Sequence, residues 1–502
     1  MKDVFVSYIA FAVIVGMLAC NKLVENPSSA ITASQFYKAQ NDAVAAVNAV
    51  YTVLNSDPAG DFPMYGRQLN LMTDNATDNQ NFSPSNTNPD VRAMSTATYV
   101  SSNGRILKNW QQHYYGINRA NIAIDGLSAM PASVFTTSGL QTRLIGEARF
   151  IRGLLYFNLV RLFGPVPLIL HNPSSVDIAS LQVPRASTDS VYAQIIADLT
   201  YGFALPSAYS GADVGRVTSG AAHALLAKVY IYERDWADAS SELLRVLTAG
   251  TFSGATGPYG YGLFPNYGDA FAKATKNGVE HIFSVQYATS LGEANAINDL
   301  SQSFTSFNTG TYPIDIPSDS SVSGLFASSD TRKAVTFYTS VYNAATGVSV
   351  VFNNPYTPYF NKFVDYSVTP LNNQTVSGVN YPVIRYADVL LSYAEVLNEL
   401  NGGPSADAYT AINLVRARAH VAPLTVGLGV ADFRDSVFLE RRKEFIQEGQ
   451  RWFDLVRQGV AVYLAAQHKI AAHASAVAQD TLFPIPLTEI QLDPLLTQNA
   501  GW

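Results

Sequence analysis

The sequence predicts a mainly α-helical protein in which paired helices form a scaffold and one long insertion is rich in loops. Apolar residues recur at helical spacing in both halves of the chain. Between them, residues 251–381 lack this periodicity and are dense in Gly, Ser, Thr, Asn, Pro and aromatic residues. We therefore expect one compact body whose helices carry a loop-rich surface.

The clearest predicted helix covers residues 143–163. Its apolar side chains recur at steps of three and four and form one stripe: Ala148, Ile151, Leu155, Leu159 and Leu162. The stripe leaves Arg149, Arg152 and Arg161 to one side. Pro165 ends the helix, because proline lacks the backbone donor and disfavours helix in the residue before it. Residues 166–170 are then expected to be extended.

A second helix is expected to begin near Ser187, with Thr188 or Ser190 as its N-cap, and to end before Pro206. A helical hairpin follows, with one helix over 221–230 and a return helix over 236–247 that Gly250 closes.

Small residues on the facing sides of this hairpin, with Trp236 near the turn, resemble the tetratricopeptide pattern. Similar pairs can be drawn for 383–400 with 406–419, and for 42–54 with 110–127. The sequence therefore predicts a tetratricopeptide-like helical-repeat scaffold. Trp110 begins one of these helices and is expected in the core.

Composition excludes some classes of function. Hydrophobic residues make up 48% of the chain and aromatic residues 12%, which indicates a packed globular body. Charged residues make up 14%, against about 25% in typical soluble proteins, so the surface must rely on uncharged polar side chains. The net charge of -7 provides no basic stripe for a phosphate backbone, so we expect no nucleic-acid partner.

The N-terminal residues are typical of a secretory signal. An apolar run extends from Val4 to Ala19, follows Lys2, and is short for a permanent membrane span. The residues Met17-Leu18-Ala19-Cys20 resemble the lipobox of bacterial lipoproteins, which implies a signal peptide over 1–19 and lipidation of Cys20. An ordinary secretory signal with a chance cysteine stays open, because Met17 replaces the usual leucine. As Cys20 is the only cysteine, no internal disulfide is possible.

Motifs for catalysis are missing from the sequence. There is no Walker A loop, no HExxH and no GxSxG. His468 and His473 are five residues apart, which on a helix separates them by more than a quarter turn, so we expect no metal site there. We expect no cofactor and no catalytic residue. A surface hydrolase stays open as an alternative, because 39 acidic residues always offer pairs of carboxylates that could meet in space.

Four segments and the chain end carry a specific resemblance. The segments are Gly146–Leu168, Gly215–Thr218, Tyr381–Leu391 and Glu440–Gly459, and the end contains Leu482-Phe483-Pro484-Ile485-Pro486 with Glu489, Ile490, Asn499 and Trp502. In order and spacing they resemble the SusD/RagB family of Bacteroidetes outer-membrane lipoproteins. The closing Asn499-Ala500-Gly501-Trp502 departs slightly from the family's usual Asn-Pro-Gly-Tyr type of ending. The resemblance covers nearly the whole chain, with an N-terminal region over 20–250 and a C-terminal region over 251–502 that contains the insertion at 251–380.

The resemblance implies a surface protein that binds oligosaccharides, or in some branches peptides, and delivers them to a SusC-type TonB-dependent transporter. It also implies attachment to the outer membrane through the N-terminal lipid, with the protein facing the exterior. Relatives bind ligand in a shallow site made by variable loops, which correspond here to residues 73–103 and 251–381. Tyrosine rings stack on the C–H faces of sugars, while Asn, Asp and Arg bind the hydroxyl groups. The candidate ligand residues are Asp74, Asn75, Tyr99, Tyr312, Tyr342 and Tyr356.

The charged residues of the segment 440–459 are expected to belong to the scaffold. Their spacing permits pairs along one exposed helix face and with the arginines of the 143–163 helix, each pair worth a few tenths of a kcal/mol. The residues concerned are Glu440, Arg441, Arg442, Lys443 and Glu444. Trp452 and Phe453 are expected to anchor the terminal helix in the core rather than to contact ligand.

Overall fold

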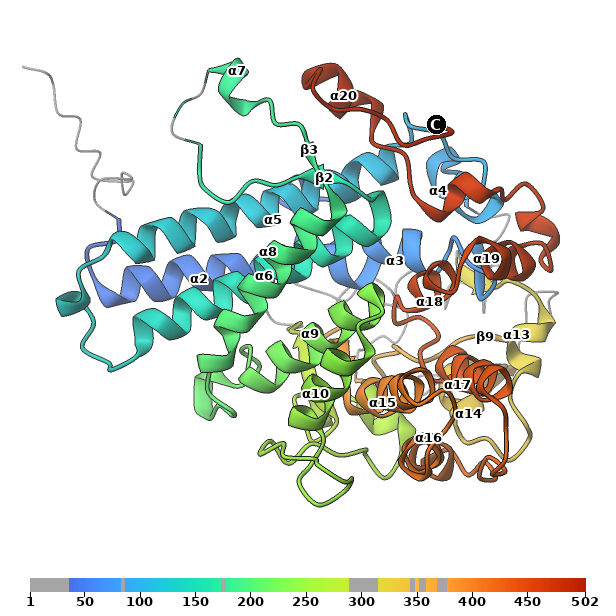
Figure 1. Ribbon diagram of the computed structural model, residues 1–502. Helices are drawn as coiled ribbons and strands as arrows, with labels where there is room; N and C mark the ends of the chain where they lie inside the picture. The colour runs from blue at the N-terminus through green and yellow to red at the C-terminus, as the bar shows by residue number, and fades with distance from the viewer. Residues whose placement is uncertain are drawn as a thin grey trace, which may run out of the picture.

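The computed structural model describes residues 36–82, 86–173, 175, 177–288, 315–343, 348–351, 358–367 and 377–502. Within these residues the chain is mainly helical, and its sheets are small and two-stranded (Figure 1). This confirms the predicted fold class. The predicted signal peptide over 1–19 and the predicted lipidation site Cys20 lie outside the described residues.

The N-terminal half is built from four long helices, with α6 packed among the other three. They are α2 (Gln40–Asn55), α5 (Gly104–Ala129), α6 (Leu140–Phe163) and α8 (Thr188–Tyr201). Helix α6 packs against the other three, so nearly all of its residues are buried and not only the predicted stripe. Arg152 is buried with them and is held by Asp198, whose carboxylate oxygens lie 2.8 and 2.7 Å from Nε and Nη2. Trp110 is 3% exposed in α5, as predicted.

The ends of α6 and α8 follow local rules. Gly164 has φ +73°, a left-handed conformation that glycine adopts at low cost, and it ends α6. The extended segment predicted after it contains β2 (Val166–Pro167), which pairs with β3 (Arg185–Ala186). Helix α8 is capped by Ser187, whose Oγ accepts from the Ser190 amide at 3.2 Å. The predicted N-cap, Thr188 or Ser190, was therefore wrong, because these residues lie one and three positions after the observed N-cap.

The three predicted helix pairs are confirmed. Helix α9 (Ser219–Glu233) packs on α10 (Trp236–Val246), α15 (Tyr386–Leu400) packs on α16 (Ala406–Arg418), and α2 packs on α5. The expected helix at 383–400 begins later, because residues 381–385 form strand β10 (Tyr381–Arg385). This strand pairs antiparallel with β4 (His281–Val285). Pro382 and the β-branched Val383 and Ile384 favour a strand over a helix here.

The single helix expected at 440–459 is interrupted. Helix α17 (Val430–Glu444) ends in a tight turn, after which α18 (Arg451–Arg457) begins. Gln447 and Gly449 both have φ +66° in this turn, and a Cβ at Gly449 would lie 2.9 Å from Tyr381 Oη. Trp452 and Phe453 are 0% and 5% exposed in α18, which confirms their predicted place in the core. Helices α19 (Val460–Gln467) and α20 (Leu487–Leu492) follow.

The remaining elements are short. Before α5 lie α3 (Leu69–Thr73), β1 (Gln80–Phe82) and α4 (Pro89–Thr96), and α7 (Ile178–Leu181) precedes β3. The predicted insertion contains β5 (Asp315–Pro317), α13 (Ser320–Gly324), α14 (Arg332–Thr336), β6 (Phe337–Tyr338), β7 (Ser340–Asn343), β8 (Val348–Val351) and β9 (Tyr359–Phe360). Elements of two to five residues leave little periodicity in the sequence, which is why this region was expected to be loops.

A buried arginine–carboxylate cluster joins the insertion to the C-terminal helices. Its ion pairs connect five cationic side chains with five carboxylates: Arg332, Lys362, Arg385, Arg416 and Arg418 with Glu280, Asp330, Glu440, Glu444 and Glu448. Glu444 pairs with Arg332 and Arg385 at 3.1 Å each and also with Arg418. The expectation of exposed pairs for Glu440 and Glu444 was wrong, because α17 turns these residues inward.

A second group of ion pairs fastens α9 to α15, α17 and α18. Lys228 Nζ lies 2.5 Å from Asp388 Oδ2, and Arg441 bridges Asp388 at 2.7 Å and Asp454 at 2.9 Å. Arg457 pairs with both Asp454 and Glu395. None of these partners belongs to α6, so the predicted pairing of the 440–444 residues with the 143–163 helix was also wrong.

Asp74 connects α3 to the turn between α17 and α18. Its carboxylate accepts from Asn70 Nδ2 at 2.5 Å and from the Gly449 amide at 3.1 Å, and the residue is 1% exposed. Burial raises the pKa of this carboxyl to about 7, even though the two donors favour the ionised form. The folded protein therefore holds a proton on Asp74 over a range of pH in which the unfolded chain releases it.

Asp74→Asn replaces the titrating carboxyl group with an amide. The folded and unfolded states then no longer differ in proton binding at this position. A raised folded-state pKa means that the Asp74 contribution to stability is full below pH 4 and is lost as the pH rises to 7. We expect the difference in unfolding free energy between the wild type and Asp74→Asn to depend on pH. Between pH 4 and pH 8 the wild type should lose on the order of 4 kcal/mol relative to the variant. Urea unfolding of both proteins at several pH values measures this difference.

The exposed Asp432 offers a matched control, because Asp432→Asn changes the same functional group without touching the interior. Its unfolding free energy should follow the wild type across this pH range. Parallel profiles for the wild type and Asp74→Asn would contradict the assignment.

Candidate ligand-binding face

A short strand pair brings together the two regions in which the sequence predicts ligand loops. Strand β1 pairs antiparallel with β5, with Asn81 opposite Ile316, although more than 230 residues separate the two strands. Ser318 strengthens the junction, because its Oγ donates to the Asp78 carbonyl at 2.6 Å. Strand β5 also contacts β9. We call the region formed by β1, β5, β6, β9 and residues 358–367 the loop face; its strands are mostly buried, and Tyr366 and Ser367 are exposed.

The loop face lies at one edge of the molecule. Figure 1 shows β9 and α13 at the right-hand side, beyond α17 and α14, and away from α2, α5 and α6. The long N-terminal helices are therefore at a distance from this surface. Their role here is to stabilise the body that carries it.

An exposed tyrosine with a polar neighbour lies on the loop face. Tyr366 is 61% exposed and is the most exposed aromatic side chain in the described part of the chain. Its hydroxyl donates to Asn361 Oδ1 at 2.5 Å, which fixes the orientation of the ring relative to the amide. Below it, Tyr338 and Tyr359 pack edge to face with ring centroids 6.1 Å apart. A ring beside an amide is suited to stacking on a sugar while binding its hydroxyl groups.

Two arginines hold the loop face from beneath. Arg451 donates hydrogen bonds to both Asp78 carboxylate oxygens, at 2.7 and 2.8 Å. Arg442 Nε donates to Asn79 Oδ1 at 2.7 Å. Burial alone would raise the pKa of Asp78, but Arg451 and Arg442 outweigh it and lower the pKa to about 2. Burial lowers the pKa of Arg442 to about 10, so both partners are charged at neutral pH. Residues 78–82 are thereby fixed in place.

Three of the predicted ligand residues lie in the interior. Asp74 and Asn75 are 1% and 0% exposed, and Tyr99 is 4% exposed. The Tyr99 ring stacks on Trp502 with centroids 5.4 Å apart and also contacts Phe483 at 5.1 Å. The described residues of this region, 73–82 and 86–103, form β1, α4 and turns, and many of them pack on the core. These positions do not support a direct ligand contact for the three residues.

The other three predicted ligand residues stay predictions. Tyr312 and Tyr356 lie outside the described residues, and Tyr342 belongs to β7, where it pairs with Ser349 of β8. Strand β7 begins two residues after β6, which belongs to the loop face. Sequence reasoning missed Tyr366 and Asn361, because nothing in their spacing separates them from the other aromatic and amide residues of the insertion.

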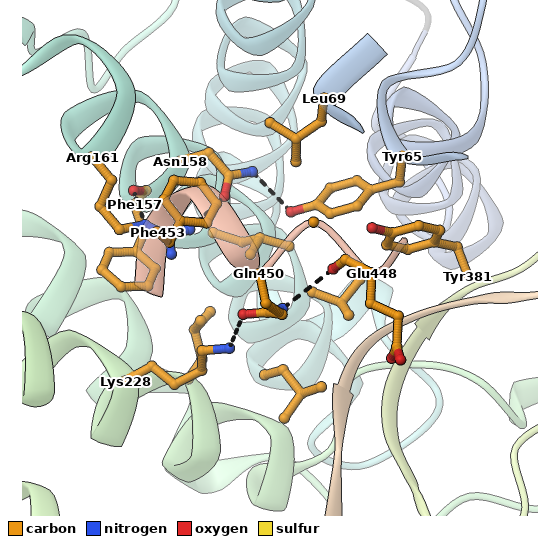
Figure 2. A pocket seen from close by; sticks show the side chains of 15 residues that line it. Tyr65, Leu69, Phe157, Asn158, Arg161, Lys228, Tyr381, Glu448, Gln450 and Phe453 are labelled. Atoms are coloured by element: carbon orange, nitrogen blue, oxygen red, sulfur yellow. Dashed lines mark hydrogen bonds between the residues drawn. The ribbon is translucent and has the colours of Figure 1, made fainter. Parts of the chain in front are cut away.

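A separate pocket lies inside the scaffold and is too small for a sugar. It has a volume of about 30 Å³ and lies between α6, α9 and the turn at 448–450. Figure 2 shows Asn158 donating to Tyr65 Oη at 2.8 Å and Lys228 donating to Gln450 Oε1 at 3.0 Å across it. Such a volume holds a water molecule. We therefore assign this pocket to the scaffold.

The described residues contain neither a metal-binding cluster nor a helix that could span a membrane. No group of three or more His, Cys, Asp or Glu residues that could hold a metal ion occurs there. His473 is buried, and its Nδ1 lies 2.8 Å from Gln467 Oε1. Over the same residues, the helices are either too short or too polar to cross a lipid bilayer.

Comparison with known proteins identifies two family models that match most of the chain. The model described as the SusD family matches residues 287–502, and the model described as starch-binding associating with outer membrane matches residues 28–231. SusD-like protein P2 of Formosa agariphila is 26% identical over 97% of this chain and 97% of its own length.

Solved structures agree with this result. A SusD superfamily protein from Parabacteroides distasonis aligns with a TM-score of 0.77 at 26% identity, over 92% of this chain and 99% of its own. A structure described as a laminarin binding SusD-like protein aligns with a TM-score of 0.75 at 26% identity, over 93% of this chain and 100% of its own. Fold, motifs and relatives agree, and the chain belongs to the SusD/RagB family.

Proposed function

We propose that this protein is a surface lipoprotein that captures oligosaccharides on its loop face and delivers them to a SusC-type TonB-dependent transporter. The observation that carries the proposal is Tyr366, an exposed ring of the loop face whose hydroxyl donates to the Asn361 amide oxygen. A solved structure that aligns over 93% of this chain is described as a laminarin binding SusD-like protein, which supports a glycan as the ligand class.

The chemistry of the loop face suits reversible binding. A tyrosine face can contact the C–H face of a sugar ring, and the Asn361 amide beside the Tyr366 hydroxyl can bind sugar hydroxyl groups. The nearby charged groups Asp78, Arg442 and Arg451 are paired with one another, so they are not available as a general acid and a nucleophile. We therefore propose binding without catalysis, with the cargo released unchanged to the transporter.

Substituting the aromatic residues of this surface tests the proposal. We expect Tyr366→Ala to weaken binding of a soluble polysaccharide about tenfold, which corresponds to about 1.4 kcal/mol, because the stacking surface is lost. Tyr312→Ala, Tyr342→Ala and Tyr356→Ala are expected to weaken it as well. Affinity electrophoresis in gels that contain laminarin, and then a panel of other soluble glucans, mannans and xylans, measures the retardation.

Tyr230→Ala is the control, because Tyr230 is a partly exposed tyrosine of α9, on the scaffold. It should leave the retardation unchanged. Equal effects of Tyr230→Ala and Tyr366→Ala would speak against the loop face as the binding surface. A wild-type protein that no polysaccharide retards, and that carries co-purified peptides in mass spectrometry, would instead belong to a peptide-binding branch. Released reducing ends in the same panel would indicate a surface hydrolase.

Cys20 is proposed as the site of lipidation. An acyl chain contributes about 0.8 kcal/mol per buried methylene, so a multiply acylated terminus keeps a protein on a membrane. We expect metabolic palmitate labelling of the wild type and none of Cys20→Ser, and protease added to intact cells should degrade the wild type. The wild type should also co-purify with a β-barrel transporter from solubilised outer membranes. An unlabelled, protease-resistant wild type would refute the surface location.

A further inference from the structure

A larger cavity lies on another part of the molecule. It has a volume of about 300 Å³ and lies between three segments, 207–218, 259–261 and 277–284. This is the lower end of the range for small-molecule sites. The cavity adjoins the start of α9, which lies left of centre in Figure 1, whereas β9 and α13 mark the loop face at the right.

Two stacked tyrosines form one wall of this cavity. The rings of Tyr259 and Tyr261 have centroids 5.3 Å apart and planes 24° apart, and both side chains are partly exposed. The Tyr261 hydroxyl lies 3.1 Å from Thr218 Oγ1, which fixes its ring. A Cβ at Gly220 would lie 2.8 Å from Tyr261 Oη, so glycine at this position lets the rings lie against α9.

Three of the residues that line this cavity carry buried polar atoms without partners in the described part of the chain. Tyr209 Oη, His281 Nδ1 and Ser284 Oγ are buried and have no hydrogen-bond partner in the described part of the chain. His281 Nε2 lies 2.8 Å from the Ala270 carbonyl oxygen, and burial lowers the pKa of the ring. The neutral ring therefore donates through Nε2 and leaves Nδ1 as an acceptor. Buried polar groups are normally satisfied, so three such residues beside one cavity make its wall polar as well as aromatic.

The positive charge beside the cavity is neutralised by neighbouring carboxylates. Arg216 is the charged side chain among its lining residues. Its guanidinium contacts Glu147 Oε2 at 2.8 Å, Asp213 Oδ1 at 2.6 Å and Asn48 Oδ1 at 2.7 Å. No excess positive charge remains to attract an anion, and the unpartnered polar atoms disfavour a purely apolar ligand.

We propose that this cavity is a second binding site, separate from the loop face, for a small neutral polyhydroxylated ligand of the size of one or two sugar residues. The ligand stacks on Tyr259 and places its hydroxyl groups against the polar residues of the cavity wall. This site does not depend on the function proposed for the loop face, because no residue is shared between the two surfaces.

Ligand-observed NMR with free monosaccharides tests the proposal, because a single sugar residue can bind in a small cavity and does not need an extended binding surface. Saturation transfer is recorded from the protein to glucose, galactose, mannose, xylose and N-acetylglucosamine. We expect transfer to at least one of them with the wild type and with Tyr366→Ala. We expect at least a fivefold loss with Tyr259→Ala, and retention with Tyr259→Phe, which keeps the ring.

A second variant guards against a general effect of Tyr259→Ala on folding. Val279 lines the cavity and is 42% exposed, so Val279→Glu places an unpaired carboxylate at the opening and leaves the core intact. It should abolish the transfer without changing the thermal unfolding midpoint. The proposal is overturned if none of the five sugars receives saturation from the wild type, or if Tyr259→Ala and Val279→Glu leave the transfer unchanged. Loss with Tyr366→Ala alone would assign the sugars to the loop face and also overturn it.

Discussion

Glu444 is the residue on which the arrangement of the C-terminal half depends. Its carboxylate is fully buried at the end of α17 and pairs with Arg332, Arg385 and Arg418, which come from three other parts of the chain. Burial alone would raise the pKa of Glu444, but the three arginines outweigh it and hold the pKa far below its usual value. A charge buried in this way is tolerated only while all of its partners are in place.

The same cluster explains how a region with little regular structure presents a defined surface. Lys362 follows β9 and reaches inward, where Nζ lies 2.7 Å from Glu448 Oε1 and from the Ile446 carbonyl oxygen. Arg332 lies in α14, just before β6, and joins Asp330 to the cluster at 2.8 Å. Lys362, next to β9, and Arg332, next to β6, thus connect the loop face to the helical body. Tyr366 can keep its orientation because residue 362 nearby is anchored.

The sequence predicted the helices well and the role of the charged residues poorly. Apolar periodicity located α6, α9, α10 and α16, and large aromatic residues such as Trp452 were placed correctly in the core. The run 440–444 has the spacing of a solvated helix face, and only the three-dimensional structure reveals the partners that allow it to be buried. The pairing of β1 with β5 and the packing of Tyr99 on Trp502 depend on contacts between distant residues, which local patterns do not reveal.

Urea unfolding of Arg385→Met, compared with Arg434→Met, tests most directly whether the buried arginine–carboxylate cluster stabilises the fold. The Arg385 side chain is 1% exposed and pairs with Glu280, Glu444 and Glu448, whereas the Arg434 side chain is 37% exposed and, within the described residues, pairs only with Glu399. We expect Arg385→Met to lose about 3 to 5 kcal/mol of unfolding free energy, because it leaves buried carboxylates without their partner. Arg434→Met should lose less than about 1 kcal/mol. Losses of equal and small size in both variants would contradict the account.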